Sequence, residues 1–181
     1  MINKFYKTIH NKYSRFFRFI FFLRYVFGLF VIAIILFLLV PNYFNYEERS
    51  ETFKNHLIKN YDLRILKYEK IEFNSFPVPY IEFKNAIIKL KTSPAEINVK
   101  KFKIYPKFLS IYNYENFQSK KIVLKNSIMI SEFLAFKFFV IKFINQKNNF
   151  YFDDLNIKIN NKSKSLVSIE KVKFANYGYK K

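Results

Sequence analysis

The chain carries a long stretch of apolar residues near its N-terminus. From Tyr25 to Tyr46 there is no charged residue, and Val26 to Val40 consists almost entirely of Phe, Leu, Ile and Val. An apolar helix of about 20 residues spans the roughly 30 Å hydrocarbon core of a bilayer. Residues 19–44 are therefore predicted to form one transmembrane helix, preceded by a basic tail over residues 1–18.

The residues that flank this stretch predict its ends and its orientation. Arg18 and Arg24 lie where long side chains can reach the headgroups, and Tyr43 and Phe44 suit the opposite interface. Basic residues precede the span, and no acidic residue occurs before Glu47. The positive-inside rule then places the N-terminus in the cytoplasm and the rest of the chain outside it. We expect a single-pass protein of the bacterial inner membrane with a periplasmic body.

Two alternative interpretations of the apolar segments are disfavoured. A cleaved signal peptide has a shorter apolar region followed by small residues, whereas this one ends in LLVPNYFNYE. The second apolar segment, Phe133 to Ile144, is short and interrupted by Lys137 and Lys142, which argues against a second span. It is predicted to be a buried or surface-lying helix, with Ser131 as a plausible N-cap.

After the span, the spacing of apolar residues is first helical and then alternating. Residues 47–61 are predicted to form an amphipathic helix, with Phe53, Leu57 and Tyr61 on one face. From residue 62 to the end, apolar and polar residues alternate in many short runs. This pattern is typical of strands with one apolar and one wet face. His56, within the helix, is interpreted as a surface or helix-face residue.

A recurring pattern runs through these strands: two mostly charged residues separate two alternating apolar runs. It occurs as LKYEKIEF from Leu66, INVKKFKI from Ile97, FQSKKIVL from Phe117 and VSIEKVKF from Val167. The central pair shifts the alternation by one residue. The apolar side chains would therefore change faces unless each strand bulges or turns at the pair.

These elements predict an α+β fold. One transmembrane helix is followed by a body over residues 62–181 built on a mainly antiparallel, curved, groove-like sheet with one or two helices. Alternation is the same whether the apolar strand faces form an open trough or a closed core, and both remain possible at this point.

Composition adds a strong positive charge and excludes thiol chemistry. The formal net charge is +19, from 32 Lys and Arg against 13 Asp and Glu. This surplus is compatible with an anionic lipid surface, nucleic acid or an acidic partner. A Lys-, Asn-, Ile- and Phe-rich composition is also what an AT-rich genome encodes, and we favour that explanation. The chain has no Cys, so disulfides and thiolate metal sites are excluded.

No recognisable catalytic or cofactor motif is present, and we expect neither enzymatic activity nor a cofactor or metal. The two histidines are His10 and His56. Asp153 and Asp154 are adjacent, so on a strand their carboxylates point to opposite faces. Lysines and aromatic residues interleave from Lys101 to Phe108, as in single-strand nucleic-acid binders. A body outside the cytoplasm argues against nucleic acid and favours anionic headgroups or a solvated strand face.

Several ordered segments resemble the start of AsmA-like proteins. After the anchor and short helix come FNSFPVPYIEFKNAIIKL and AEINVKKFKIYPKFLSIYNYENFQSKKIVLKNSIMI. The turn Phe76-Pro77-Val78-Pro79, the strand Ala95 to Ile104, the crossover Phe108 to Ile111 and the strand Lys121 to Ile130 follow the family's order. The resemblance covers residues 16–144, and Phe76, Pro77 and Pro79 carry its most specific motif.

The resemblance implies an inner-membrane protein of outer-membrane or envelope biogenesis whose apolar β-groove shields or transfers phospholipid. Members are usually several times longer, so this chain corresponds at most to the membrane-proximal end of such a groove. The expected partners are the bilayer, phospholipid and envelope proteins. An alternative is a bitopic scaffold whose body binds a protein partner. The residues expected to line the groove are Ile81, Phe83, Ile97, Val99, Ile122, Leu124, Ile128 and Ile130.

Overall fold

The computed structural model describes residues 13–91, 95–107, 109–113, 115–161 and 164–178. The chain divides into two compact units, residues 1–40 and residues 41–181. His10 and Phe108, singled out in the sequence, lie outside the described residues.

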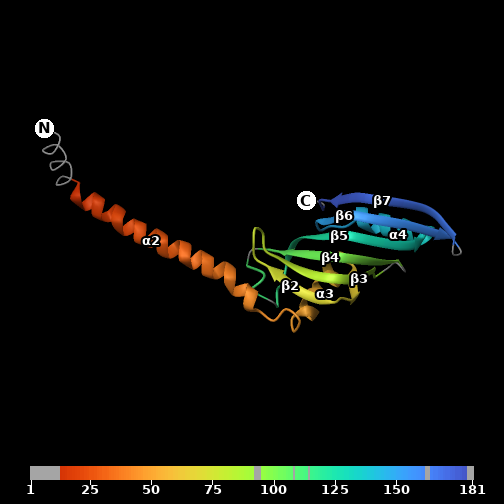
Figure 1. Ribbon diagram of the computed structural model, residues 1–181, viewed down its shortest axis with the longest axis horizontal. Coiled ribbons are helices and arrows are strands. Elements are labelled where there is room, and N and C mark those ends of the chain that lie inside the picture. The colour runs from red at the N-terminus through yellow and green to blue at the C-terminus, as the bar shows by residue number, and fades with distance from the viewer. Residues whose placement is uncertain (1–12, 92–94, 108, 114, 162–163, 179–181) are drawn as a thin grey trace. The chain divides into compact units, whose positions relative to one another are not determined.

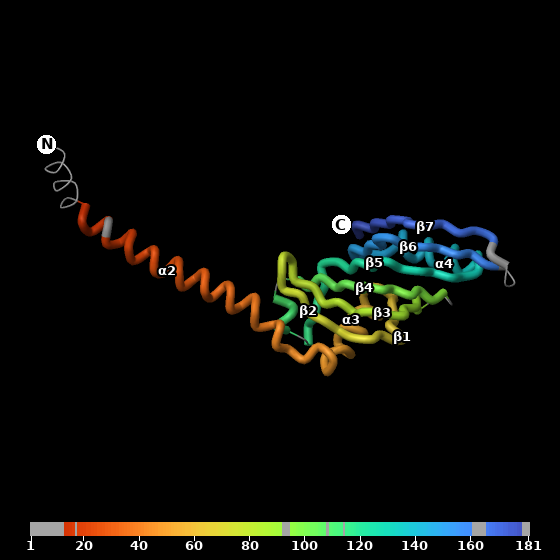
Figure 2. The backbone as a smooth tube through the Cα atoms, viewed as in Figure 1, coloured from red at the N-terminus to blue at the C-terminus, as the bar shows by residue number. Residues whose placement is uncertain are grey.

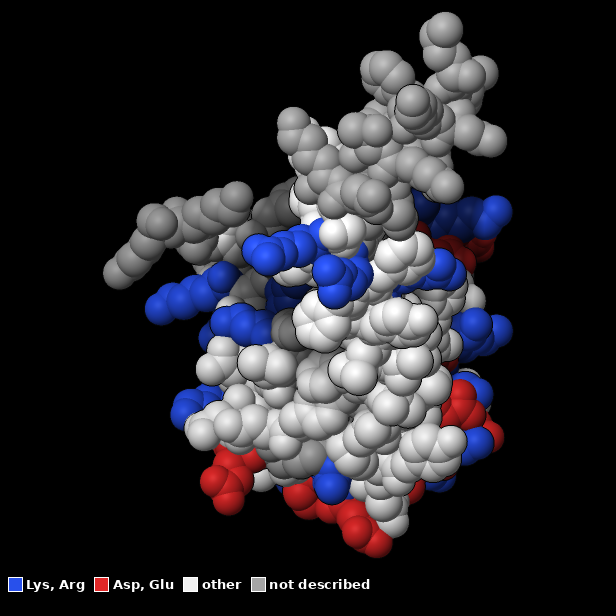
Figure 3. All heavy atoms as spheres, turned by 90° about the vertical axis from the view of Figure 1, so that its left-hand side faces the viewer, with Lys and Arg blue, Asp and Glu red and all other residues white. Residues whose placement is uncertain are grey.

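The first unit contains one long apolar helix, α2 (Ser14–Leu39). Together with the short 3-10 helix η1 (Val40–Tyr43) it forms a 30-residue segment long and apolar enough to cross a membrane. None of the most apolar part of this segment is buried against protein. Figure 3 shows a face of the molecule on which uncharged side chains predominate. The chain therefore has the expected candidate transmembrane helix of a single-pass membrane protein.

The second unit is an α+β body built on one seven-stranded sheet (Figures 1 and 2). Its helices are α3 (Ser50–Tyr61) and α4 (Phe133–Ile144). The strands are β1 (Leu63–Lys67), β2 (Lys70–Asn74), β3 (Tyr80–Leu90), β4 (Glu96–Pro106), β5 (Ser119–Glu132), β6 (Phe150–Asn161) and β7 (Lys164–Asn176). The strand order is β1-β3-β4-β5-β6-β7, and β2 pairs with β3 beside β1. The predicted fold class is confirmed.

All strand pairs are antiparallel except one. β5 and β6 run parallel, with Ile122 opposite Phe150 and Met129 opposite Ile157. Antiparallel strands can be joined by a tight turn, but parallel strands require a crossover of a dozen or more residues. Helix α4 and its flanking loop provide this crossover. The predicted helix Phe133 to Ile144 is thus confirmed at its bounds, and it connects two parallel strands.

The predicted cap of this helix is wrong. Ser131 still belongs to β5, and the residue at the N-cap position is Glu132, which makes no side-chain capping hydrogen bond. The hydroxyl of Ser131 is buried and has no hydrogen-bond partner among the described residues. The strand continues further than expected because Ser131 and Glu132 still pair with Ile159 and Asn160 of β6. Pairing across the sheet therefore overrides the local capping preference.

Four strand residues with a left-handed backbone interrupt the regular alternation of the sheet. Asn85, Asn126, Asp154 and Lys171 have φ values of 48°, 51°, 69° and 56°. These positive values turn the backbone, and Asn and Asp adopt them more readily than most residues. Because of this turn, the apolar residues before and after each of these positions stay on one face. The β6–β7 register also shifts around Asp154 and Lys171, so the pair Glu170-Lys171 lies at a bulge, one of the two outcomes the sequence left open.

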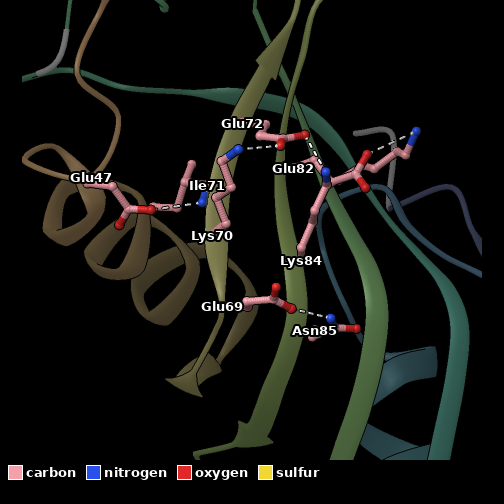
Figure 4. A network of polar contacts seen from close by, with 9 residues as sticks. Glu47, Glu69, Lys70, Ile71, Glu72, Glu82, Lys84 and Asn85 are labelled. Atoms are coloured by element: carbon pink, nitrogen blue, oxygen red, sulfur yellow. Dashed lines mark hydrogen bonds and ion pairs between the residues drawn. The ribbon is translucent and has the colours of Figure 1, made fainter.

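In the LKYEKIEF segment the chain leaves the strand just before the charged pair Glu69-Lys70, so one strand ends there and another begins. β1 stops at Lys67 and β2 begins at Lys70, and both pair with β3. The exposed side of β2 is protected by a side chain. The amide of Ile71 donates a 2.9 Å hydrogen bond to a carboxylate oxygen of Glu47 (Figure 4). Strand edges with unsatisfied amides invite pairing with other chains, so this contact blocks part of the edge.

The outer face of the sheet carries charged pairs between neighbouring strands. Glu72 binds Lys84 at 2.7 Å and Lys70 at 2.9 Å, as Figure 4 shows. Further along, Glu82 pairs with Lys103 at 3.4 Å, and the Lys103 ammonium lies 3.9 Å from the centroid of the Tyr80 ring. Many of the lysines that dominate the composition thus have partners within this wet face.

Candidate functional site

The predicted groove residues divide between the two faces of the sheet. Six of them lie on the inner face and are at most 2% exposed: Ile81, Phe83, Ile97, Val99, Ile122 and Leu124. They are covered by helix α3, whose Phe53, Leu57 and Tyr61 are fully buried against the sheet, and by α4. The inner face is thus a closed aromatic and aliphatic core at these positions. An acyl chain could reach them only if the helices moved.

Ile128 and Ile130 lie on the opposite, outer face, with exposed fractions of 38% and 51%. The cause is the left-handed backbone at Asn126, after which Ser127 and Met129 take the buried positions. The placement of Ile128 and Ile130 beside Leu124 on one apolar face was therefore wrong. Ile130 pairs with Glu96 on one side and Lys158 on the other, so its surroundings are polar.

Helix α4 carries a cluster of exposed apolar side chains. The inward side of α4 packs Phe139 and Phe143 against the sheet, with ring centroids 5.6 Å and 5.0 Å from those of Phe152 and Phe150. The outward side bears five apolar side chains between 46% and 64% exposed, which we call the α4 apolar face: Phe133, Leu134, Phe138, Ile141 and Ile144. Leu134, Phe138 and Ile141 follow the spacing of a single helix face.

The last strand extends the exposed apolar area. Val167 and Ile169 of β7 pair with Ile159 and Ile157 of β6, so they belong to the inner face of the sheet. Unlike their buried partners on β6, they are 46% and 42% exposed. β7 pairs only with β6 among the described strands, so its outer edge is open. Exposed apolar patches rimmed by polar residues are typical of interaction surfaces.

The residues expected at the membrane edge differ in their surroundings. Arg18 lies in α2, where its Nε atom is 3.5 Å from the carbonyl oxygen of Ser14, and Arg24 lies in the same helix. Tyr43 is 88% exposed. Phe44, in contrast, packs within the body, with its ring centroid 5.9 Å from that of Tyr112 and the Arg49 guanidinium carbon 4.7 Å from the centroid of its own ring. Phe44 thus contacts residues of the body.

The AsmA-like turn motif connects β2 to β3. Phe76 is exposed, and the peptide bond between Phe76 and Pro77 is cis. Pro79 directly precedes β3. These residues are remote from the α4 apolar face in the sheet order, because the motif lies at the β2 side and α4 packs against β5 and β6. The motif therefore shapes a turn and adds no side chain to that surface.

The structure brings together a histidine and a serine that the sequence gave no reason to connect. The Nε2 atom of His56 lies 2.8 Å from the Ser119 hydroxyl, which is also 2.8 Å from the hydroxyl of Tyr61. The two residues His56 and Ser119 are 63 positions apart. A histidine within hydrogen-bond reach of a serine is the arrangement of a general base and its nucleophile. The protonation of the ring decides whether this arrangement could function in that way.

The hydrogen bonds around His56 favour a tautomer that cannot act as such a base. The amide nitrogen of Asn60 donates to the His56 carbonyl oxygen at 3.0 Å and lies 3.0 Å from His56 Nδ1. The carbonyl fixes the amide as a donor, so Nδ1 accepts and the proton of the neutral ring resides on Nε2. Nε2 then donates to Ser119 and cannot take its proton. We interpret the cluster as a structural hydrogen-bond network.

Titration of His56 provides a test of this network. Burial lowers the pKa of the His56 imidazole below its ordinary value, and a hydrogen bond with the Phe117 backbone only partly opposes this. As the pH falls below about 6.5, His56 is protonated in the unfolded chain before it is protonated in the folded chain. The free energy of unfolding therefore decreases until the pH reaches the lower pKa of the folded state. We expect the free energy of unfolding of the His56→Gln variant to depend less on pH over this range. Urea unfolding of the full chain in mild detergent, followed by tyrosine fluorescence between pH 7.5 and pH 5, measures it.

His10→Gln serves as the control, because it removes the other histidine of the sequence, in the predicted basic tail. Equal pH dependence in the wild type and the His56→Gln variant would contradict the buried, neutral histidine.

The remaining polar candidates have structural roles in the body. Asp153 forms ion pairs with Lys125 at 3.0 Å and Lys173 at 3.3 Å, and these lysines hold the pKa of its carboxyl below the usual value. Asp154 is one of the bulge residues. In the basic-aromatic stretch, Phe102 is buried in the core, whereas Lys101 and Lys103 lie on the strand's other side. The stretch is thus split between two faces.

Comparison with known proteins identifies no relative. No family model matches the chain, and neither a curated protein nor a solved structure matches it. The AsmA-like resemblance therefore rests on the residues quoted above.

Proposed function

We propose that this protein is a membrane-anchored, non-enzymatic lipid-handling protein of the AsmA-like type, whose α4 apolar face contacts acyl chains. The observation that carries the proposal is the pairing of this exposed face with an apolar helix able to span a membrane. In this interpretation the protein belongs to the bacterial inner membrane and contributes to envelope biogenesis, with its body in the periplasm.

The position of the apolar residues favours surface contact over an internal channel. The inner face of the sheet is covered by the helices of the body. The proposed lipid-binding surface is therefore formed by α4 and the uncovered part of β7, and not by Leu124 and its neighbours. A helix with large apolar side chains on one side and lysines beside them is suited to the boundary between headgroups and acyl chains. Lys137, which is exposed, supplies positive charge beside these side chains, whereas Lys142, at the end of the helix, is paired with Asp62 at 3.1 Å.

The covalent connection to the anchor makes a weak surface contact effective. The body begins at Pro41, directly after α2 and without a separate linker domain. A tethered surface acts at a high local concentration of membrane, so a modest affinity suffices for contact. The positive charge of the body, with 26 Lys and Arg against 13 Asp and Glu after Arg24, adds attraction to anionic lipid.

A single-tryptophan experiment tests the proposal. The chain contains no Trp, so Phe138→Trp introduces one reporter into the α4 apolar face. The full chain is reconstituted in vesicles whose lipids carry brominated acyl chains, which quench tryptophan on contact. We expect the emission of the Phe138→Trp variant to fall by at least half relative to unbrominated vesicles, because the ring lies among acyl chains.

Two further variants serve as controls for this measurement. Tyr105→Trp places the reporter on the outer face of the sheet and is expected to remain unquenched. Phe30→Trp, in α2, is expected to be quenched as a membrane-embedded standard. Quenching of Phe30→Trp without quenching of Phe138→Trp would contradict the proposed lipid contact.

The second candidate function is a scaffold that binds a protein partner, and the open edge of β7 favours it. This strand has 13 residues, and its unpaired side could accept a strand from another chain. Val167 and Ile169 would then be covered by the partner. Protection of the β7 amides from hydrogen exchange by an added protein, with Phe138→Trp unquenched, would support this function instead.

A further inference from the structure

A polar hollow on the body is separate from the α4 apolar face. It has a volume of about 1210 Å³ and lies between helix α3, the segment that connects β4 to β5, and the loop that connects α4 to β6. Its aromatic wall is Phe117, whose ring centroid lies 4.9 Å from that of Phe53 and 5.1 Å from that of His56. Phe117 thereby joins the end of the connecting segment to α3 beside the hollow.

Positive charge gathers around this hollow. Four of its lining residues are lysines, against one carboxylate, Glu115: Lys59, Lys107, Lys120 and Lys147. None of the four forms an ion pair with a described carboxylate, whereas lysines on the outer sheet face, such as Lys84 and Lys103, do. The Lys107 ammonium is held in place by the side-chain oxygen of Gln118 at 2.8 Å. A concave site lined by one sign of charge concentrates ligands of the opposite sign.

The floor of the hollow presents hydroxyl and amide groups. Ser119 lies between His56 and Tyr61, with 2.8 Å contacts to both, so its hydroxyl is oriented by two neighbours. Asn148 donates a 2.7 Å hydrogen bond to the Asn60 carbonyl oxygen and so joins the α4–β6 loop to α3. Amides and hydroxyls in a fixed arrangement recognise the hydroxyls of a polyol or sugar, while ammonium groups recognise phosphate.

We propose that this hollow binds a phosphate ester of a polyol or sugar. The phosphate lies among the lysines, and the ligand hydroxyls face Ser119 and the asparagines of the wall. Ligand sites typically enclose about 300–1,000 Å³, so the hollow has room for a ligand of this class. The same chemistry occurs in a phospholipid headgroup and in a soluble sugar phosphate. The site is independent of the α4 apolar face, so either proposal can fail without the other.

Calorimetric titration of the full chain in uncharged detergent tests the site, with glycerol 3-phosphate as the soluble probe and inorganic phosphate as the comparison. We expect glycerol 3-phosphate to bind at least tenfold more tightly than inorganic phosphate. The double variant Lys59→Gln/Lys120→Gln is expected to weaken binding at least tenfold. The matched control, Lys67→Gln/Lys100→Gln, removes the same charge from exposed lysines of β1 and β4 and is expected to change binding less than twofold.

A second arm identifies the source of the ligand. The full chain in nanodiscs of phosphatidylcholine is compared with nanodiscs containing one-fifth phosphatidylglycerol. If the site takes a lipid headgroup, we expect the second lipid to shift the amide signals of Asn148 and Ser119 and to prevent glycerol 3-phosphate from binding. If it takes a soluble ester, glycerol 3-phosphate binds equally in both nanodiscs.

Ser119→Ala tests the hydroxyl floor. Its expected effect is loss of the preference for glycerol 3-phosphate over inorganic phosphate, with phosphate binding unchanged. The proposal is overturned if neither probe binds, if both probes bind the wild type equally, or if the two double-lysine variants weaken binding alike. Circular dichroism of each variant shows that it remains folded.

Discussion

Leu124→Asp is expected to unfold the body, whereas Ile130→Asp, six residues further along the same strand, is expected to leave it folded. Leu124 is 0% exposed in β5, between Phe102 of β4 and Phe152 of β6. An aspartate there buries a charge without a partner or retains a proton at a large cost in free energy. We expect the free energy of unfolding to fall by about 4–5 kcal/mol or more, a large part of the stability of a small domain.

Ile130 lies in the opposite environment. Half of its side chain is exposed, and Lys158 is its neighbour on β6. Aspartate at this position stays in water, so a change within about 1 kcal/mol is expected, as for other surface substitutions. Urea unfolding and near-ultraviolet circular dichroism of the two variants, in detergent and with the anchor present, give the comparison. Equal destabilisation by both substitutions would show that the two residues share one face.

This pair of residues also shows what alternation alone could predict. Leu124 and Ile130 are separated by an even number of positions, so simple alternation places them on the same side. The recurring charged pairs do not include the residues between these two, so the change of face was not predicted. The left-handed backbone at Asn126 produces this change, and asparagine is among the residues that adopt this conformation readily. The asparagine was the sequence signal that could have identified the change.

The helices and the fold class were more accessible to prediction than the connectivity. The bounds of α4 agree with the predicted helix because Phe133 to Ile144 is a continuous apolar segment between strands. The predicted helix at residues 47–61 is confirmed as α3, though it starts at Ser50. The parallel pairing of β5 with β6 was missed, because strand alternation is the same in parallel and antiparallel pairs. The closed core was one of two possibilities and depends on the packing of α3 and α4.

The polar cluster around Ser119 could not be predicted from the sequence. His56 belongs to a helix and Ser119 to the start of a strand, and only the folding of the β4–β5 connection brings them together. Neither residue lies in a recognisable motif. The four unpaired lysines of the hollow were equally hidden among 32 basic residues. Sites assembled from separate elements leave no local pattern, so the three-dimensional arrangement was required.

Phe139→Ala and Phe138→Ala are expected to differ by several kcal/mol although the residues are adjacent. Phe139 is 1% exposed and packs against Phe143, at a centroid distance of 6.1 Å, and against Phe152. Its truncation leaves a cavity between α4 and the sheet, so the free energy of unfolding is expected to fall by about 3–5 kcal/mol. Phe138 is 50% exposed, and its truncation is expected to change that free energy by less than about 0.5 kcal/mol.

The two substitutions also separate stability from function. If the α4 apolar face serves lipid contact, Phe138→Asp should leave thermal unfolding of the full chain in detergent unchanged. In vesicles, Phe138→Asp should also increase the labelling of α4 by water-soluble reagents. A face retained only for packing would give the reverse result, with lower stability and no change in labelling. The five large apolar side chains of this face contribute little to the core, so their exposure requires another explanation, and contact with acyl chains supplies one.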